Sequence, residues 1–240
     1  MDETGEPVMH FLTAFFSDPT HWAGPDGIPH RVVQHLWYTF LSLLVAWAIA
    51  FPVGLYIGHT GRAAFLAINI GNAARALPTL GLLVLLVLLL SIGLLPVLIA
   101  LVVLAIPPIL TATYAGIRSV EPDIVDAARG MGMTERQVLF SAELPAALPV
   151  IFGGLRSATL QVVSTATVAA YVGLGGLGRF LIDGLAQHDY AQMLGGAVLV
   201  AVLAILLDVS IVGLRYVTAP GGLAARRNTL TTARQATAAA

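Results

Sequence analysis

The sequence predicts an all-α, polytopic membrane protein with about five transmembrane helices. Hydrophobic residues make up 58% of the 240 residues and charged residues only 10%, whereas soluble globular domains carry about 25% charge. The mean hydropathy of +0.87 agrees with a chain that contacts lipid. At about 20 residues per crossing, this length allows one bundle of roughly five or six helices and no large soluble domain. We therefore expect a transmembrane domain over residues 31–218, preceded by an extracytoplasmic segment, residues 1–30.

The first expected span is Val32–Ile57, in which Pro52 should introduce a kink. The segment before it is acidic and lacks the basic start and cleavage site of a signal peptide. The apolar region that follows the first span, residues 63–117, is too long for a single crossing. Ser91-Ile92-Gly93 with Pro96 favours a hairpin within it.

This hairpin divides the region into a second span that ends near Leu90 and a third span, Leu94–Ile117. We expect the second span to have a broken start, because Asn72, Arg75 and Pro78 precede its most apolar run. An ionisable group in a span costs about 2.5 to 3.5 kcal/mol at mid-depth, which makes it a functional candidate. Arg75 is therefore a candidate for a translocation pathway, although structural pairing is an equally good interpretation.

The fourth expected span, Leu148–Val172, is only weakly apolar. Ser157, Gln161 and Ser164 fall at helical spacing on one face, with Thr165 beside them. A lipid-facing helix would carry Leu, Ile and Val at these positions. We therefore expect this helix inside the bundle and take these four residues as further candidates for a translocation pathway.

A glycine-rich connection, Gly173–Gly178, follows the fourth span and matches G-x-G-x-x-G. It does not lie between a strand and a helix, so a flexible or tightly packed turn is favoured over a dinucleotide site. A short helix over Arg179–Ala186 and a fifth span over Met193–Val217 complete the bundle, and the tail, residues 219–240, should be disordered. Arg156 and Asp208 also fall within spans, where we favour structural pairing over a pathway role.

The arginines predict the orientation of the bundle. With five spans, two arginines lie on the outer side (Arg31 and Arg179) and eight on the cytoplasmic side: Arg62, Arg118, Arg129, Arg136, Arg215, Arg226, Arg227 and Arg234. Because cytoplasmic loops carry the excess of basic residues, we expect the N-terminus outside and the C-terminus inside the plasma membrane.

Several functions are excluded by composition. The chain has no cysteine, and all 12 basic residues are arginines. Without a lysine it cannot form a nucleotide-binding P-loop, so any ATP hydrolysis requires another polypeptide. The six histidines have no metal-type spacing, and there is no G-x-S-x-G nucleophile motif. We expect no metal, no cofactor, no nucleic acid partner and no enzyme chemistry within this chain.

The charged segment, Ser119–Pro145, lies between two apolar spans and reads as helix, turn, helix. Pro122 suits a first helical position, and Gly130 and Gly132 should end that helix. Thr134 with Gln137 has the form of a capping box, which would start a second short helix that stops before Pro145.

The pattern Asp126-Ala127-Ala128, Gly132, Leu144-Pro145 resembles the EAA loop of ABC importer permeases. Asp126 replaces the usual glutamate and Ala142 the usual isoleucine, and both changes keep the character of the site. The chain as a whole resembles the membrane-spanning subunit of a type I ABC importer with the MetI-like permease fold. From Asp126 to Gly178 it is most similar to permeases for glycine betaine, carnitine, choline or proline.

This resemblance implies that Asp126, Ala127, Ala128, Gly132, Leu144 and Pro145 couple the chain to a separate ATPase subunit, which binds ATP and Mg. It also implies an extracytoplasmic solute-binding protein and a second permease subunit, identical or related. The alternatives are an ABC permease for methionine or another small amino acid, an ion-coupled secondary transporter and a non-transporting scaffold subunit. A secondary transporter would need inverted repeats and a driving-ion site, neither of which is evident in the sequence.

Overall fold

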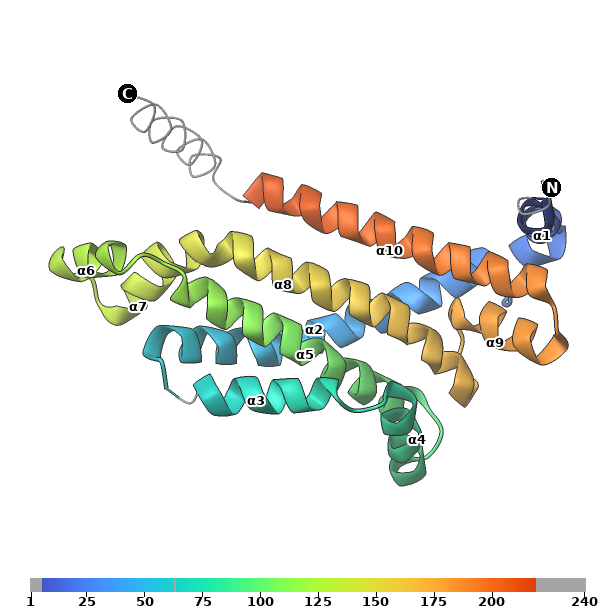
Figure 1. Ribbon diagram of the computed structural model, residues 1–240, viewed down its shortest axis with the longest axis horizontal. Helices are drawn as coiled ribbons and strands as arrows, with labels where there is room; N and C mark the ends of the chain where they lie inside the picture. Colours follow the sequence, from blue (N-terminus) through green and yellow to red (C-terminus); the bar gives the residue numbers. More distant parts are fainter. Residues whose placement is uncertain (1–5, 63, 219–240) are drawn as a thin grey trace.

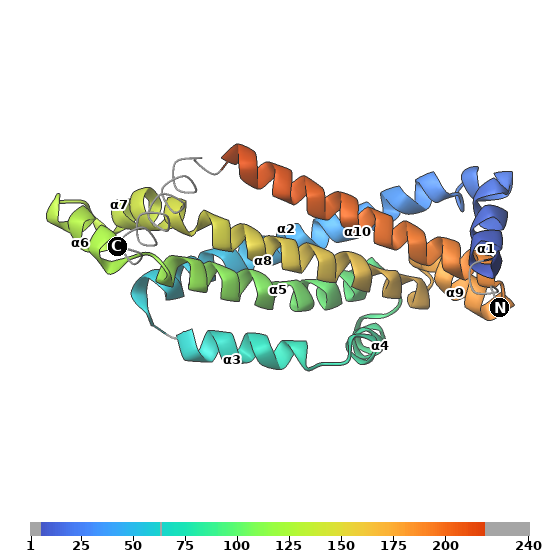
Figure 2. The same ribbon diagram turned by 45° about the horizontal axis from the view of Figure 1, so that its top comes forward.

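The computed structural model describes residues 6–62 and 64–218, and these residues form helices joined by short turns. Among them, four helices are long and apolar enough to cross a membrane. They are α2 (Ile28–Thr60), α5 (Leu94–Arg118), a continuous helix over Glu135–Val172 that contains α8 (Leu144–Thr165), and α10 (Tyr190–Thr218). All four run along the long axis of the molecule (Figures 1 and 2). The expected all-α, polytopic fold is confirmed.

Small residues bring α2 close to α5 at the centre of the bundle. A Cβ atom added to Gly54 would lie 2.6 Å from Thr113 Cβ, and one added to Gly58 would lie 2.8 Å from Ile117 Cβ. Glycines four residues apart on one helix face allow two helix backbones to approach closely in a membrane. Gly54 and Gly58 therefore allow α2 to pack closely on α5. Helices α2, α5 and α8 form the main packed layer, with Ala46, Ala50, Leu101, Ala105, Ala158 and Val162 in its core.

Two shorter helices occupy the region of the expected second span. Helices α3 (Ala64–Arg75) and α4 (Thr79–Leu90) each have 12 residues and are separated by a break that ends at Pro78. The break lies where a broken start is expected from the sequence. A helix of 12 residues is about 18 Å long, which is too short for a hydrocarbon core of about 30 Å. Helix α3 runs beside α5, whereas α4 turns across the bundle and is seen almost end-on in Figure 2.

The charged segment extends from one end of the bundle. Helix α6 (Pro122–Gly130) begins with Pro122, as expected, and α7 (Glu135–Gln137) begins with the predicted capping box, formed by the side chains of Thr134 and Gln137. The expectation that the second helix stops before Pro145 is wrong. The chain continues through one turn of π-helix, Val138–Glu143, directly into α8.

The π-helical turn explains how a helix can pass through Pro145. Proline lacks a backbone N–H and clashes with the carbonyl group four residues before it in an α-helix. The N–H of Leu144 donates to the carbonyl of Leu139, five residues back, which is the wider π spacing. The proline therefore lies at the start of α8 without ending the helix.

The opposite end of the bundle contains shorter elements. A 3₁₀ helix, Ala166–Val172, continues α8, and α9 (Gly178–Gln187) corresponds to the short helix expected over Arg179–Ala186. Helix α1 (Glu6–Ser17) lies against α10 and is followed by a 3₁₀ turn, Pro19–Trp22. Residues 1–5 and the tail expected to be disordered, residues 219–240, lie outside the described residues.

Candidate functional site

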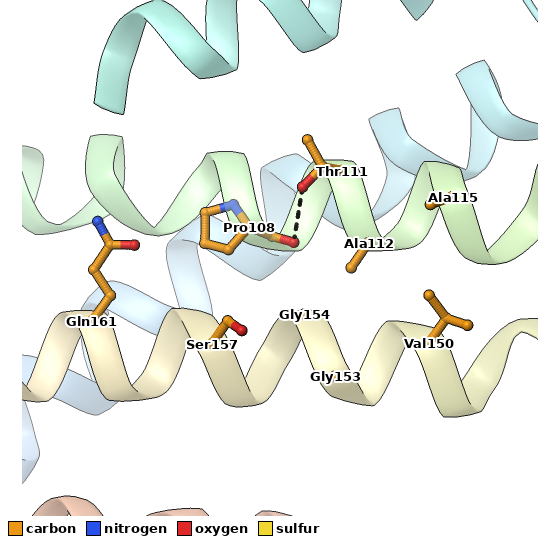
Figure 3. Close-up of a pocket in the computed structure, with 9 residues that line it drawn as sticks. All are labelled: Pro108, Thr111, Ala112, Ala115, Val150, Gly153, Gly154, Ser157 and Gln161. Carbon is orange, nitrogen blue, oxygen red and sulfur yellow. Dashed lines mark hydrogen bonds between the residues drawn. The ribbon is translucent and has the colours of Figure 1, made fainter. Parts of the chain in front are cut away.

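An open cavity of about 500 Å³ lies between α5 and α8 (Figure 3). Its polar groups are the hydroxyls of Thr111 and Ser157 and the amide of Gln161. The lining contains no charged side chain, and all of its residues are small or of medium size: Pro108, Thr111, Ala112, Ala115, Val150, Gly153, Gly154, Ser157 and Gln161. Such a surface can form hydrogen bonds with a polar solute without holding it by a fixed charge.

The cavity forms beside a point of very close helix contact. A Cβ atom added to Gly154 of α8 would lie 2.2 Å from Ala112 Cβ and 2.8 Å from the carbonyl oxygen of Pro108. Only glycine fits at this position. The neighbouring Gly153 has no atom within 4 Å of such a Cβ and faces open space. Small side chains at this contact therefore bring the two helices together and leave the groove beside it open.

Two of the five pathway residues expected from the sequence meet in this cavity. Ser157 and Gln161 line it from α8, as their shared helix face predicts. Ser164 is exposed and its hydroxyl donates to the carbonyl of Leu160. Thr165 instead borders a second, much smaller pocket with α4 and α5. Arg75 ends α3, but its side chain lies outside the described residues, so its expected role stays a prediction.

An ion pair joins α8 to α10. The guanidinium of Arg156 donates two hydrogen bonds to the carboxylate of Asp208, with Nη2 2.7 Å from Oδ2 and Nε bonded to Oδ1. This bidentate arrangement is the strongest geometry for an arginine and a carboxylate. The structural pairing favoured by the sequence is thus present, and these two residues are each other's partners.

The expected coupling residues lie in and around the turn of the charged segment. Asp126 and Ala127 are exposed on α6, whereas Ala128 is buried. Gly132 has a φ of +83°, a left-handed conformation that glycine adopts at little cost. Its N–H donates to Arg129 O and the next N–H to Ala128 O, which is the Schellman arrangement that ends a helix. Leu144 and Pro145 are half-buried at the start of α8.

Three large apolar side chains are exposed on the same segment: Ile124, Met131 and Phe140. Met131 is 73% exposed at the turn itself. Apart from its two neighbours, no atom of the described residues lies within 4 Å of a Cβ placed on Gly132, so the described surface beside the turn is open. An apolar, open surface bordered by charges is the composition of a protein–protein contact.

The charges of this segment form a network that reaches α2. The guanidinium of Arg129 is bonded to both carboxylate oxygens of Glu135, each at 3.0 Å, and this raises the pKa of Arg129 above its ordinary value. His59, at the end of α2, lies between Glu135 and the buried Glu143. In the part of the chain that the structure describes, no group of His, Cys, Asp and Glu has an arrangement suited to a metal ion.

At the other end of the bundle, the glycine-rich connection packs against α2. The N–H of Gly176 donates to Oε1 of Gln34 at 2.8 Å, and the N–H of Leu177 donates to Nδ1 of His35 at 3.3 Å. Nε2 of His35 in turn donates to Val163 O at 2.9 Å. Gly173–Gly178 is therefore a tightly packed turn, as favoured from the sequence.

Sequence reasoning did not identify Gln34, His35, His59 or Glu143 as contact residues, because the contacts that join them to other helices and turns span many residues of sequence, from 84 for His59–Glu143 to 142 for Gln34–Gly176. One signal was available for His35. A polar side chain within an apolar span must find a hydrogen-bond partner inside the bundle.

Comparison with known proteins agrees with this arrangement. The model of the family "binding-protein-dependent transport system inner membrane component" matches residues 30–221. The carnitine transport permease protein OpuCB of Listeria monocytogenes is 33% identical over 208 residues, covering 87% of this chain and 93% of the relative. The choline transport system permease protein OpuBB of Bacillus subtilis is 32% identical, covering 83% of this chain and 90% of the relative.

A solved structure shares the fold. A chain of the MetNI methionine ABC transporter in an inward-facing conformation superimposes with a TM-score of 0.69 at 24% identity, covering 90% of this chain and all of that chain. This likeness shows a MetI-type permease fold. The family match spans most of this chain, and the curated relatives exceed 30% identity over most of their own length. The chain therefore belongs to the family of binding-protein-dependent transport system inner membrane components, as a permease subunit of an ABC importer.

Proposed function

We propose that this chain carries a compatible solute, such as glycine betaine, carnitine, choline or proline, across the plasma membrane in an ATP-driven importer. The observation that carries the proposal is one continuous helix, Glu135–Val172. It begins in the exposed charged segment and passes along the uncharged cavity that contains Ser157 and Gln161. A force applied at the charged segment thus reaches the cavity through a single rigid element.

The choice of solute rests on the relatives and on the chemistry of the cavity. The curated relatives are named for carnitine and choline transport. An uncharged lining with hydroxyl and amide groups suits a solute whose positive and negative charges balance each other, or one with a quaternary ammonium group. A permease for methionine or another small amino acid is the alternative. It has weaker support, because the likeness to the methionine transporter extends to the fold alone.

The proposal requires partners. A separate ATPase subunit, which binds ATP and Mg, would dock on the charged segment at Ile124, Ala127, Met131 and the open side of Gly132. An extracytoplasmic binding protein would deliver the solute and hold a quaternary ammonium group by cation–π contacts. A second permease subunit, identical or related, would close the open side of the cavity.

The proposed orientation sets the side of the membrane on which the ATPase docks. The arginine bias favours an N-terminus outside and a C-terminus inside, with the charged segment in the cytoplasm. ATP-driven closure of two ATPase subunits would then move Asp126, Ala127, Ala128 and Gly132 together with Leu144 and Pro145. The helix that follows would move with them, so that the cavity opens alternately to the outside and to the inside of the membrane.

Substitution of Gly132 tests the docking role. Gly132→Val should leave membrane insertion intact, but a β-branched residue at φ +83° is strained and distorts the turn. We expect uptake in proteoliposomes to fall strongly while the ATPase still hydrolyses ATP. Gly130→Val is the matched control, because Gly130 ends α6 with a helical φ and open space around it. Wild-type uptake by Gly132→Val would refute the coupling role of this turn.

The energy source separates this proposal from an ion-coupled transporter. Uptake into vesicles should follow ATP supplied on the cytoplasmic side and persist when ionophores collapse the ion gradients. Uptake that follows an ion gradient in the absence of ATP would favour the secondary transporter instead.

A further inference from the structure

His59 lies where the end of α2 meets the charged segment. Its side chain is 13% exposed. Nδ1 is 2.6 Å from Oε2 of Glu143, and Nε2 is 3.2 Å from Oε2 of Glu135. One imidazole ring therefore contacts two carboxylates, one on α7 and one on the π-helical turn that leads into α8.

The two carboxylates differ in exposure. The Glu143 side chain is 7% exposed, whereas that of Glu135 is 60% exposed. A buried carboxylate is costly unless a cation and hydrogen bonds compensate it. Within the described chain, His59 provides the hydrogen bond to Glu143. The π-helical turn at the base of α8 thus depends on this histidine to keep its carboxylate in the protein interior.

The two carboxylates approach different ring nitrogens of His59. Nδ1 forms a hydrogen bond with Oε2 of Glu143 at 2.6 Å, and Oε2 of Glu135 lies 3.2 Å from Nε2. His59 therefore joins α7 and the π-helical turn to the end of α2.

The charged groups around His59 form a short chain. Glu135 is also bound by Arg129, and Nη1 of Arg129 lies 3.8 Å from Oδ1 of Asp126, the first residue of the loop pattern. These groups link Asp126 on α6 to His59 on α2 through Arg129 and Glu135, and His59 links them to Glu143. Arg62 comes shortly after His59 in the sequence and is exposed.

We propose that His59 is a positioning residue that clamps the charged segment to α2, so that movement imposed on α6 reaches α8. The proposal rests on the function proposed above. Because the imidazole contacts Glu135 and Glu143 through different ring nitrogens, it holds α7 and the π-helical turn in one arrangement at the end of α2.

The test compares His59→Gln with the double variant His59→Gln/Glu143→Gln in proteoliposomes that contain the partner ATPase. Two quantities are measured: solute taken up per ATP hydrolysed, and the ATPase that copurifies with the permease. His59→Gln should lower uptake per ATP roughly tenfold, with the ATPase still bound.

The double variant and Glu135→Gln keep the proposal testable if His59→Gln folds poorly. His59→Gln/Glu143→Gln replaces the contact between the imidazole and the buried carboxyl group by two neutral amides, so expression should recover while uptake per ATP stays low. Glu135→Gln removes the exposed carboxylate and leaves Glu143 in place, and it should lower uptake per ATP less than His59→Gln does, without loss of the fold.

Two results separate the possible failures. Wild-type uptake per ATP in His59→Gln, with the ATPase bound, would overturn the role of His59 alone. Failure of the ATPase to copurify with the wild-type chain would overturn the proposed function, and the clamp with it.

Discussion

Helix α2 holds α8 near both of its ends through a histidine, but the two contacts are chemically opposite. At one end, His35 is completely buried and bonds to a backbone carbonyl and a backbone N–H. At the other end, His59 lies between two carboxylates beside the charged segment. The first contact is made to backbone groups alone, whereas the second is made to two carboxyl groups of the charged segment. The two ends of α8 are therefore joined to α2 by different chemistry.

The backbone partners determine the form of His35. The N–H of Leu177 can only donate and the carbonyl of Val163 can only accept, so Nδ1 is the acceptor and Nε2 carries the proton. Adding a second proton would place two donors against each other.

The largest expected effect follows from loss of the neutral contact. His35→Ala would leave the Leu177 N–H and the Val163 carbonyl unsatisfied in the protein interior. Each buried unsatisfied group costs about 1 to 3 kcal/mol, so we expect a loss of about 2 to 5 kcal/mol. Thermal unfolding of the detergent-solubilised protein measures the change. His10→Ala, at an exposed site on α1, is the control, and equal melting temperatures for the two variants would remove His35 as a structural anchor.

These two contacts also show which features the sequence could predict. Apolar runs, arginine bias and cap signals depend on neighbouring residues, so the spans, the turn at Gly132 and the capping box at Thr134 follow from local patterns. The helix face with Ser157 and Gln161 is local in the same sense, since it needs only the 3.6-residue period. The contacts of His35 and His59 depend on how separate helices pack against each other, and local patterns in one sequence do not predict this packing.

Local patterns do not describe the surroundings of Pro145 and Thr165. Pro145 normally predicts the end of a helix, but a π-helical turn accommodates it and the helix continues into α8. Thr165 lies next to Ser164 in the sequence but borders a separate pocket near α4, and its pathway role stays a prediction. The position of α4 results from the break at Pro78, so the surroundings of Thr165 depend on an element far from it in the sequence.

The middle of α8 provides a test of whether packing between the two histidine contacts also holds the helix in place. Gly154→Leu would force α5 and α8 apart, because even a Cβ atom would overlap Ala112. Overpacking of this kind costs about 1 to 3 kcal/mol, and we also expect most uptake to be lost because the cavity changes shape. Gly153→Leu is the control for thermal stability, since it lies one residue away and its Cβ would face open space. Similar melting temperatures in the two variants would show that α8 is held at its ends alone.

The smallest expected effect concerns Gln34, which supports the neutral contact from the preceding position on α2. Gln34→Ala removes the acceptor for the Gly176 N–H and should cost about 0.5 to 1.5 kcal/mol, the net value of a typical hydrogen bond. Gln187→Ala, at the exposed end of α9, is the control for thermal unfolding. Gln34→Ala should leave uptake per ATP hydrolysed unchanged, in contrast to His59→Gln, because Gln34 lies at the end of the bundle opposite the charged segment. A loss of uptake per ATP in Gln34→Ala would mean that the two ends of α8 do not differ in function, and the comparison between them would fail.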